Sequence, residues 1–219
     1  MLLAEETART PEEALTLYEQ GMQAGERALG PEAFEEDAGE FWGIIETRPY
    51  MRAREGAAEC LWALDRYEEA ITHYREMLRL NPNDNQGIRY MLVRLLLKTG
   101  RDDEVGKLLE QYDEGSAEWL YTRALWTYRR DGGGSEASKL LKSAFEQNPF
   151  VPIYLSGFKR PPSRLPEYIG FGDENEAIHY FYNHVEAWLE TPGALEWFAD
   201  VFGEVLMEFE MRHLDTDDS

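Results

Sequence analysis

The chain has a single cysteine, Cys60, among its 219 residues. One cysteine cannot form a disulfide within the chain, and it cannot build a cysteine-ligated zinc site, because both need several thiols. Such sparse use of cysteine is typical of proteins in a reducing compartment. We therefore expect a cytoplasmic location and no metal or other cofactor.

The sequence also lacks long apolar runs and is poor in basic residues. Its longest apolar cluster, residues 90–97, is interrupted by Arg94, whereas a membrane-spanning helix needs roughly 18 residues. The first residues do not join a basic stretch to an apolar one, so we expect no secretory signal. Lys and Arg number 22 against 43 Asp and Glu, a formal charge of −21. Such a surface repels phosphate, so we expect neither nucleic acid nor an anionic membrane as the main partner.

What the chain does contain is an internal repeat. Marker residues stand at steps of four, three and five from Ala70 to Pro82, and again from Ala137 to Pro149. The two leading alanines are 67 residues apart, close to two periods of about 34 residues. A degenerate middle copy, with Val105 in the position of the alanine, falls between them. Three copies at one period predict a stack of similar structural units.

Each copy predicts a pair of helices, because apolar residues recur at three- and four-residue spacing. We expect helices at 50–64 and 67–80 in the first copy, and pairs within 85–112 and 117–149 in the others. Before the repeats, we expect helices at 10–29 and 30–46. After them, a loop at 158–172, packed by Phe158, Leu165, Tyr168 and Phe171, should precede helices at 173–190 and 191–213.

The predicted fold class is therefore all-α, a solenoid of helical hairpins divided into four segments. These segments are an N-terminal hairpin (1–49), three repeats (50–150), a proline-rich loop (151–172), and a C-terminal capping hairpin with a frayed tail (173–219).

The residues of the first copy resemble the tetratricopeptide signature. The matching positions are Leu64, Tyr67, Ala70, Tyr74 and Pro82, and Ala137, Leu141, Ala144 and Pro149 resemble the second half of the same signature. Residues 46–54 and 81–89 are also similar to a group of microbial tetratricopeptide-repeat proteins, which implies no particular activity. The resemblance covers about residues 50–150 and implies a right-handed superhelix. In this family a concave groove binds a peptide or protein segment, so we expect a protein-binding scaffold and not an enzyme.

The resemblance implies that the leading helix of each copy lines the groove. The inward positions are Arg52, Glu55, Glu59 and Trp62 in the first copy, Tyr90, Arg94 and Lys98 in the second, and Trp119, Thr122, Trp126 and Arg130 in the third. Aromatic and arginine side chains often dominate buried contacts with a partner. Some of these residues fit equally well as packing against the next hairpin, Trp119 and Trp126 above all. Chaperone-binding members hold a C-terminal carboxylate here with Lys and Asn, whereas Glu55 and Glu59 would repel it.

Residues that suggest catalysis are scattered. His179 and His184 are five residues apart, whereas two metal ligands on one helix face need a spacing of three or four. Cys60 follows Glu59, whose charge would raise the pKa of the thiol and weaken it as a nucleophile. The glycines at 132–134 lack the Gly-Lys-Ser/Thr pattern of a phosphate-binding loop. An enzyme therefore remains the least favoured class.

Aromatic residues gather near the C-terminus and leave two interpretations open. They are Tyr180, Phe181, Tyr182, Trp188, Trp197, Phe198 and Phe202. As the buried seam of a capping hairpin, they would cover the last open face of the repeat stack. As an exposed patch, they would mediate self-association, making the protein a homo-oligomer, or bind a protein partner.

Overall fold

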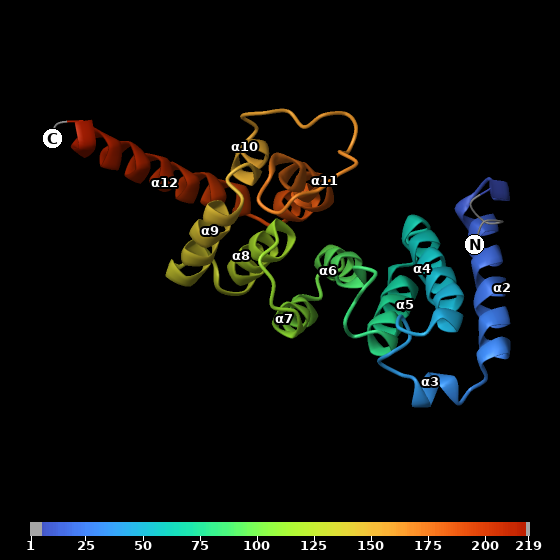
Figure 1. The fold of residues 1–219 in the computed structure, drawn as a ribbon. Coiled ribbons are helices and arrows are strands. Elements are labelled where there is room, and N and C mark those ends of the chain that lie inside the picture. The colour runs from blue at the N-terminus through green and yellow to red at the C-terminus, as the bar shows by residue number, and fades with distance from the viewer. Residues whose placement is uncertain (1–5, 218–219) are drawn as a thin grey trace. The chain divides into compact units, whose positions relative to one another are not determined.

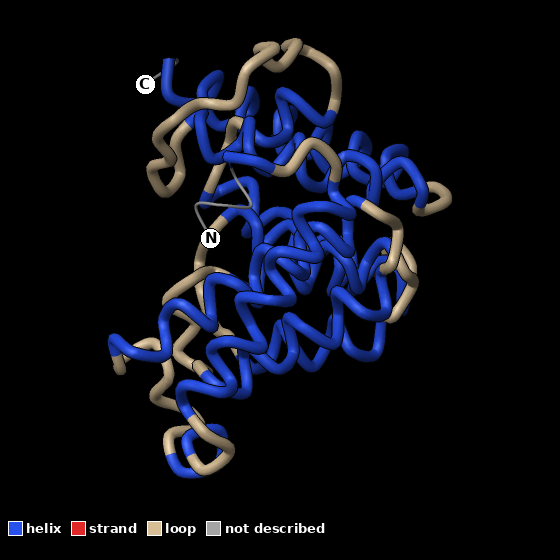
Figure 2. The backbone as a smooth tube through the Cα atoms, turned by 90° about the vertical axis from the view of Figure 1, so that its right-hand side faces the viewer, coloured by secondary structure: helices blue, strands red, loops and turns tan. Residues whose placement is uncertain are grey.

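The computed structural model describes residues 6–217, with side chains through Met211. These residues form helices and loops with no strand among them (Figures 1 and 2). The all-α fold of helical hairpins is thereby confirmed. The chain divides into two compact units, Met1–Thr99 and Gly100–Ser219.

The first unit follows the predicted repeat helices closely. Its elements are α2 (Pro11–Leu29), α3 (Ala33–Glu36), the 3-10 turn η1 (Ile45–Thr47), α4 (Arg48–Ala63), α5 (Tyr67–Leu80) and α6 (Ile88–Lys98). Helix α2 begins as expected, because the Thr10 side chain accepts a hydrogen bond from the Glu13 backbone N–H at 3.3 Å. Helices α4 and α5 are the two helices of the first copy.

Close packing of α2 against α4 depends on a missing side chain. The ring of Tyr18 lies over Gly56, where an added Cβ would come within 2.4 Å of the ring carbon Cζ. Ala57 and Ala58 beside it are completely buried. The small residues of α4 therefore allow its neighbours to approach closely.

The predicted helix at 30–46 is wrong. Only the single turn of α3 forms there, and the chain then turns at Gly39, whose φ is +102°. The backbone N–H groups of Gly39 and Phe41 both donate to the carbonyl of Leu80, at 3.0 and 3.2 Å. Leu80 is the last residue of α5, so this segment satisfies a carbonyl at a helix end that would otherwise lack a partner. Phe41 is buried in the process, against Phe34 and Tyr50.

The second unit contains the other repeat helices and the C-terminal hairpin. Its elements are α7 (Asp102–Gln111), α8 (Ala117–Asp131), α9 (Ser135–Gln147), α10 (Val151–Leu155), α11 (Glu174–Glu190) and α12 (Ala194–Asp217). Asp173 caps α11, accepting from the Glu176 N–H at 2.8 Å. Helix α12 starts after Gly193, whose φ is +76°, and passes the expected end near His213. The last two residues of the predicted frayed tail lie outside the described residues.

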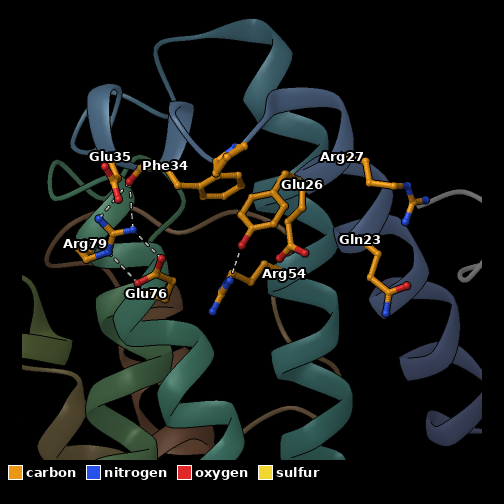
Figure 3. Close-up of a pocket in the computed structure, with 10 residues that line it drawn as sticks. Gln23, Glu26, Arg27, Phe34, Glu35, Arg54, Glu76 and Arg79 are labelled. Carbon is orange, nitrogen blue, oxygen red and sulfur yellow. Dashed lines mark hydrogen bonds and ion pairs between the residues drawn. The ribbon is translucent and has the colours of Figure 1, made fainter.

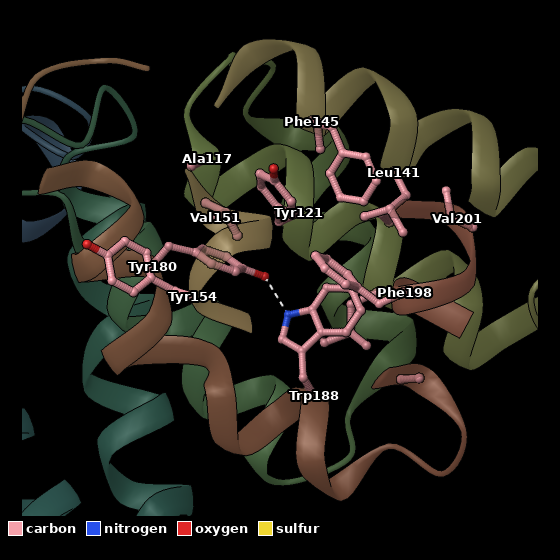
Figure 4. Packing of buried hydrophobic residues seen from close by; sticks show 14 of the residues in the cluster. Ala117, Tyr121, Leu141, Phe145, Val151, Tyr154, Tyr180, Trp188, Phe198 and Val201 are labelled. Atoms are coloured by element: carbon pink, nitrogen blue, oxygen red, sulfur yellow. Dashed lines mark hydrogen bonds between the residues drawn. The ribbon is translucent and has the colours of Figure 1, made fainter. Parts of the chain in front are cut away.

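The C-terminal aromatic residues pack inward. Tyr180, Trp188 and Phe198 are almost fully buried in one cluster with residues of α8 and α9 (Figure 4). The Trp188 indole N–H donates to the Tyr180 hydroxyl at 2.8 Å, which satisfies both polar groups inside the core. Trp197 is only 9% exposed. The buried-seam interpretation therefore applies to these four rings, and they offer no surface for self-association.

The proline-rich segment is irregular over 156–173, after the short helix α10. The expected packing by Phe158, Leu165, Tyr168 and Phe171 is wrong, because all four side chains are exposed. Polar contacts hold the loop instead. The carbonyl of Pro162 accepts from the Tyr182 hydroxyl at 2.5 Å, and the carbonyl of Pro166 lies 2.9 Å from His179 Nε2.

Candidate functional site

Seven of the eleven predicted groove residues lie in the first unit, on helices α4 and α6. We call them the α4–α6 surface: Arg52, Glu55, Glu59, Trp62, Tyr90, Arg94 and Lys98. Arg52 and Glu59 are exposed, and the other five are half-buried. Their placement leaves charged side chains from both helices accessible to a partner.

Tyr74 of α5 connects the two helices beneath this surface. Its side chain is fully buried, and its hydroxyl has no hydrogen-bond partner among the described residues. Burial raises the pKa of this hydroxyl, and the charges of Glu59 and Glu55 raise it further, whereas Arg94 lowers it. Groups from α4 and α6 therefore act on one buried hydroxyl. The ring of Trp62 packs edge-on against Tyr74, with 6.5 Å between ring centroids.

Glu55 is a carboxylate of the surface that the protein holds in place. It accepts a hydrogen bond from Gln86 Nε2 at 2.5 Å, which links α4 to the segment before α6. Burial raises the pKa of Glu55, and the Gln86 hydrogen bond opposes that rise. A half-buried carboxylate held in this way is suited to recognise a hydrogen-bond donor or a cation of a partner.

The basic side chains of the surface lie over aromatic rings. Arg52 lies 5.8 Å from the centroid of the Trp42 ring, and the Lys98 ammonium lies 6.0 Å from that of Tyr67. Such contacts hold the aliphatic part of a long side chain while leaving its charge near water. The surface therefore presents both acidic and basic groups beside aromatic rings.

The third copy does not contribute as predicted. Trp119 and Thr122 are fully buried in the second unit, so the prediction that they contact a partner is wrong. Trp119 instead faces the end of α7, where its indole N–H donates to the Tyr112 carbonyl. Trp126 is half-buried and donates to the Asp102 carbonyl at 2.8 Å. Arg130 is exposed, pairs with Asp131, and lies 4.5 Å from the Trp126 ring centroid.

A glycine on the preceding helix makes room for the ring of Trp126. Gly106 of α7 lies under the Trp126 indole, where a Cβ would come within 2.5 Å of the ring. The indole therefore fills the space that a side chain on α7 would occupy. Of the two interpretations left open by the sequence, packing between hairpins accounts for Trp119 and for most of Trp126.

The residues considered for catalysis are separated or satisfied. His184 Nε2 lies 2.6 Å from Glu118 Oε1 in the core, whereas His179 contacts the loop carbonyl of Pro166. Burial raises the pKa of the Cys60 thiol, and the charge of Glu59 adds to it, so the thiol stays protonated at neutral pH. Within the part of the chain that the structure describes, no three His, Cys, Asp or Glu side chains are placed to hold a metal ion.

A cleft that the sequence did not predict lies in the first unit, with a volume of about 920 Å³ (Figure 3). Its lining comes from α2 to α5 and includes Tyr50, Arg54, Glu76 and Arg79. Arg79 is held by two hydrogen bonds to Glu76, at 2.7 and 2.8 Å, and Arg54 donates to the Tyr50 hydroxyl. No histidine lines this cleft. Its residues are dispersed in sequence, so no local motif could have indicated it.

Comparison with known proteins supports the repeat assignment. Residues 61–118 match the family model described as tetratricopeptide repeat. The chain is 29% identical over 222 aligned residues to "Suppressor of tumorigenicity 7 protein" of Macaca fascicularis, an alignment that covers 89% of this chain and 41% of that protein. The proteins of that name from Rattus norvegicus and Mus musculus are also 29% identical, with 38% of each covered. The chain thus spans about two fifths of the length of these curated relatives.

In the residues that the structure describes, no helix combines the length and the apolarity needed to cross a bilayer.

Proposed function

Because residues 61–118 of this chain are tetratricopeptide repeats, we propose that the protein is a non-enzymatic scaffold that binds a peptide or protein segment on its α4–α6 surface. Repeats of this family generally mediate protein interactions, which is the coarse function that the family match supports. The specific surface and a cytoplasmic setting are our proposal.

The observation that carries the proposal is that Glu55, Glu59 and Arg94 are exposed or half-buried and that their charges all act on the buried hydroxyl of Tyr74. These charges come from two different helices and lie partly open to solvent. Charged groups held in position by a packed floor lose little conformational freedom when a partner binds. The surface is therefore preorganised to pair with charges of both signs.

The arrangement also indicates what kind of segment fits. Arg52 and Lys98 would attract carboxylates, while Glu55 and Glu59 would attract basic or amide groups. Trp62, half-buried against Tyr74, offers an apolar contact between them. We therefore expect a segment that carries an apolar anchor flanked by charges of both signs, and not a bare C-terminal carboxylate.

The test is a charge reversal of the two arginines. Immobilised wild-type protein and an Arg52→Glu/Arg94→Glu variant are compared for the proteins that they retain from an extract of the native host. We expect the variant to retain roughly tenfold less of the main partner, because opposite charges become like charges at the interface. Quantitative mass spectrometry measures the retained amounts.

A matched control separates this effect from the change in total charge. Lys107→Glu/Lys139→Glu changes the same number of charges at exposed positions of α7 and α9, and capture should be unaffected. Circular dichroism and the melting temperature verify folding. Arg52→Glu alone alters an exposed side chain, so it tests the surface even if the double variant is unstable. Undiminished capture by both arginine variants would refute the α4–α6 surface.

A further inference from the structure

An apolar trough runs along the C-terminal hairpin of the second unit. It has a volume of about 340 Å³ and lies between α12 and the region of α10. Leu195, Phe198, Ala199, Phe202 and Leu206 supply its α12 wall, and Leu155 and Phe158 lie opposite. The α12 residues follow the three- and four-residue spacing of one helix face.

This face adjoins the face that α12 packs into the core, and the two share Phe198. Trp197 and Val201 are buried against the rest of the unit, whereas Ala199 is exposed and Gly203 has open space where a side chain would begin. Phe158 is 75% exposed and lies 6.3 Å from the Phe202 ring, measured between centroids. The trough is therefore open to a partner and not filled by the protein's own side chains.

The apolar surface continues toward the end of α12, which extends past α9 in Figure 1. Leu206 is 45% exposed, Met207 63% and Phe209 60%. Single exposed apolar residues are normal on a protein surface, but an adjoining set beside a trough is typical of an interaction site. Methionine and phenylalanine adapt readily to the side chains of a partner.

Acidic residues border this apolar surface. From Ala194 to Met211 the helix has no Lys or Arg and carries Glu196, Asp200, Glu204, Glu208 and Glu210, all exposed. Lys142 of α9 pairs with two of them, Glu204 and Glu208, at 3.1 and 3.2 Å.

The remaining three acids, Glu196, Asp200 and Glu210, have no ion-pair partner among the described residues. Near the opposite wall, Lys159 is paired with Glu174 at 2.6 Å, which leaves Arg160 as one exposed base. The charge around the trough is therefore negative.

The negative charge around the trough indicates which kind of partner can bind there. A second copy would bring two acidic α12 helices together, at −21 formal charges per chain, and like charges across an interface oppose binding. The same acids repel an anionic membrane. A segment with an apolar face and basic flanks would avoid this repulsion, because its charge is opposite to that of the trough.

The dimensions favour a helix. Residues 195–206 extend over roughly 16 Å at 1.5 Å per residue. An amphipathic helix of about three turns would place its apolar side chains along that length, as in other helix-in-groove complexes. We propose that this trough binds a basic amphipathic helix of a protein partner. This site is independent of the proposed α4–α6 surface.

The experiment uses a designed fluorescent peptide and the full-length chain. The peptide has 14 residues, with leucines on one helix face and lysines beside them, and fluorescence anisotropy measures its affinity. A scrambled peptide of equal charge and composition lacks the apolar face and should bind roughly tenfold more weakly, since it can use charge alone. A version with Glu in place of Lys should not bind.

Two kinds of protein variant locate the site. Ala199→Gln fills the open trough without changing charge and should weaken binding roughly tenfold. Glu196→Gln/Asp200→Asn should weaken it about threefold and reduce its dependence on salt. Asp103→Asn/Glu110→Gln removes the same number of charges on the exposed side of α7, and binding should match that of the wild type. Ala199 is exposed, so its replacement leaves the core intact.

Equal binding of the designed and scrambled peptides, or an unaffected Ala199→Gln variant, would overturn the proposal. Light scattering tests the second copy: a dimer that Ala199→Gln converts to a monomer would show that the chain itself fills the trough. Sedimentation with phosphatidylcholine vesicles tests a lipid surface. The proposal of a helical partner would equally be rejected if the wild type bound vesicles but not the peptide, and if Ala199→Gln abolished the vesicle binding. Loss of capture in the Arg52 and Arg94 variants bears on the other surface alone.

Discussion

His73 of α5 shows how one residue makes stability depend on pH. Burial, together with the nearby positive charge of Arg54, lowers the pKa of its imidazole to about 4, while Glu69 opposes the change. The neutral form is therefore favoured in the folded protein. A depressed pKa contributes stability that is fully present above the unfolded pKa of 6.5 and is lost as the pH falls toward 4.

We predict that replacing His73 with glutamine removes this acid sensitivity. Between pH 6.5 and 4, the free energy of unfolding of the wild type should fall relative to the variant by ~1–2 kcal/mol, after allowing for partial exposure. Urea unfolding at several pH values measures the difference. Burial raises the pKa values of Glu55 and Asp84, which contribute in the opposite sense, so only the difference between the two proteins is informative. Parallel pH profiles would contradict the assignment.

Between elements, Glu176 of α11 joins segments far apart in the sequence. Its Oε1 accepts from the Ala117 N–H at the start of α8, at 2.9 Å. Its Oε2 accepts from Asn148 Nδ2 and from the Gly172 N–H, both at 2.8 Å. The carboxylate is 7% exposed. One buried side chain thus satisfies donors from α8, from the end of α9 and from the proline-rich loop.

We expect Glu176→Ala to lower the stability of the second unit by about 3 kcal/mol, because three donors, two of them in buried hydrogen bonds, lose their charged acceptor. Thermal unfolding followed by circular dichroism measures the loss. Glu190→Ala, at the exposed end of the same helix, is the matched control and should change stability by less than about 0.5 kcal/mol. Equal melting temperatures for the two variants would mean that water replaces the carboxylate at little cost.

For the whole molecule, the division into two compact units has a consequence for unfolding. Each unit has its own buried residues: Ile71, Tyr74 and Met77 in the first, and Leu141 and Phe145 in the second. In repeat proteins, stability is roughly a sum over neighbouring elements, so damage in one part need not spread evenly.

We predict that Leu141→Ala, which leaves a cavity in the second core, destabilises that unit by about 2–5 kcal/mol. Hydrogen exchange followed by mass spectrometry should show faster exchange in α8, α9 and α12, while amides of α4 and α5 keep their wild-type rates. Met77→Ala is the reciprocal variant and should produce the reverse pattern. A uniform increase along the chain would show instead that the two units unfold together.

The repeat helices could be predicted from the sequence because their causes are local. Apolar spacing at 67–80, the cap at Thr10 and the turn at Gly100 each act within a few residues, and α2, α5 and α7 form where we expected them. Of the candidate site, the sequence predicted charged groove residues on α4 and α6, and the structure leaves these side chains exposed or half-buried. The sequence could not show that Trp119 faces the core of its own unit, because a buried tryptophan and an exposed one can occupy the same position in the helical spacing.

The sequence by itself determined an acidic, all-helical chain with an internal repeat of helical pairs, since composition and periodicity depend only on the order of residues. Tertiary structure alone decided what each face meets. The carbonyl of Leu80 accepts hydrogen bonds from the segment at 39–41, and Gly106 leaves space for the Trp126 ring. Helix α12 buries Val201 but leaves Ala199 open on an acid-bordered trough. Each of these outcomes depends on a partner many residues away, whose position no local pattern encodes.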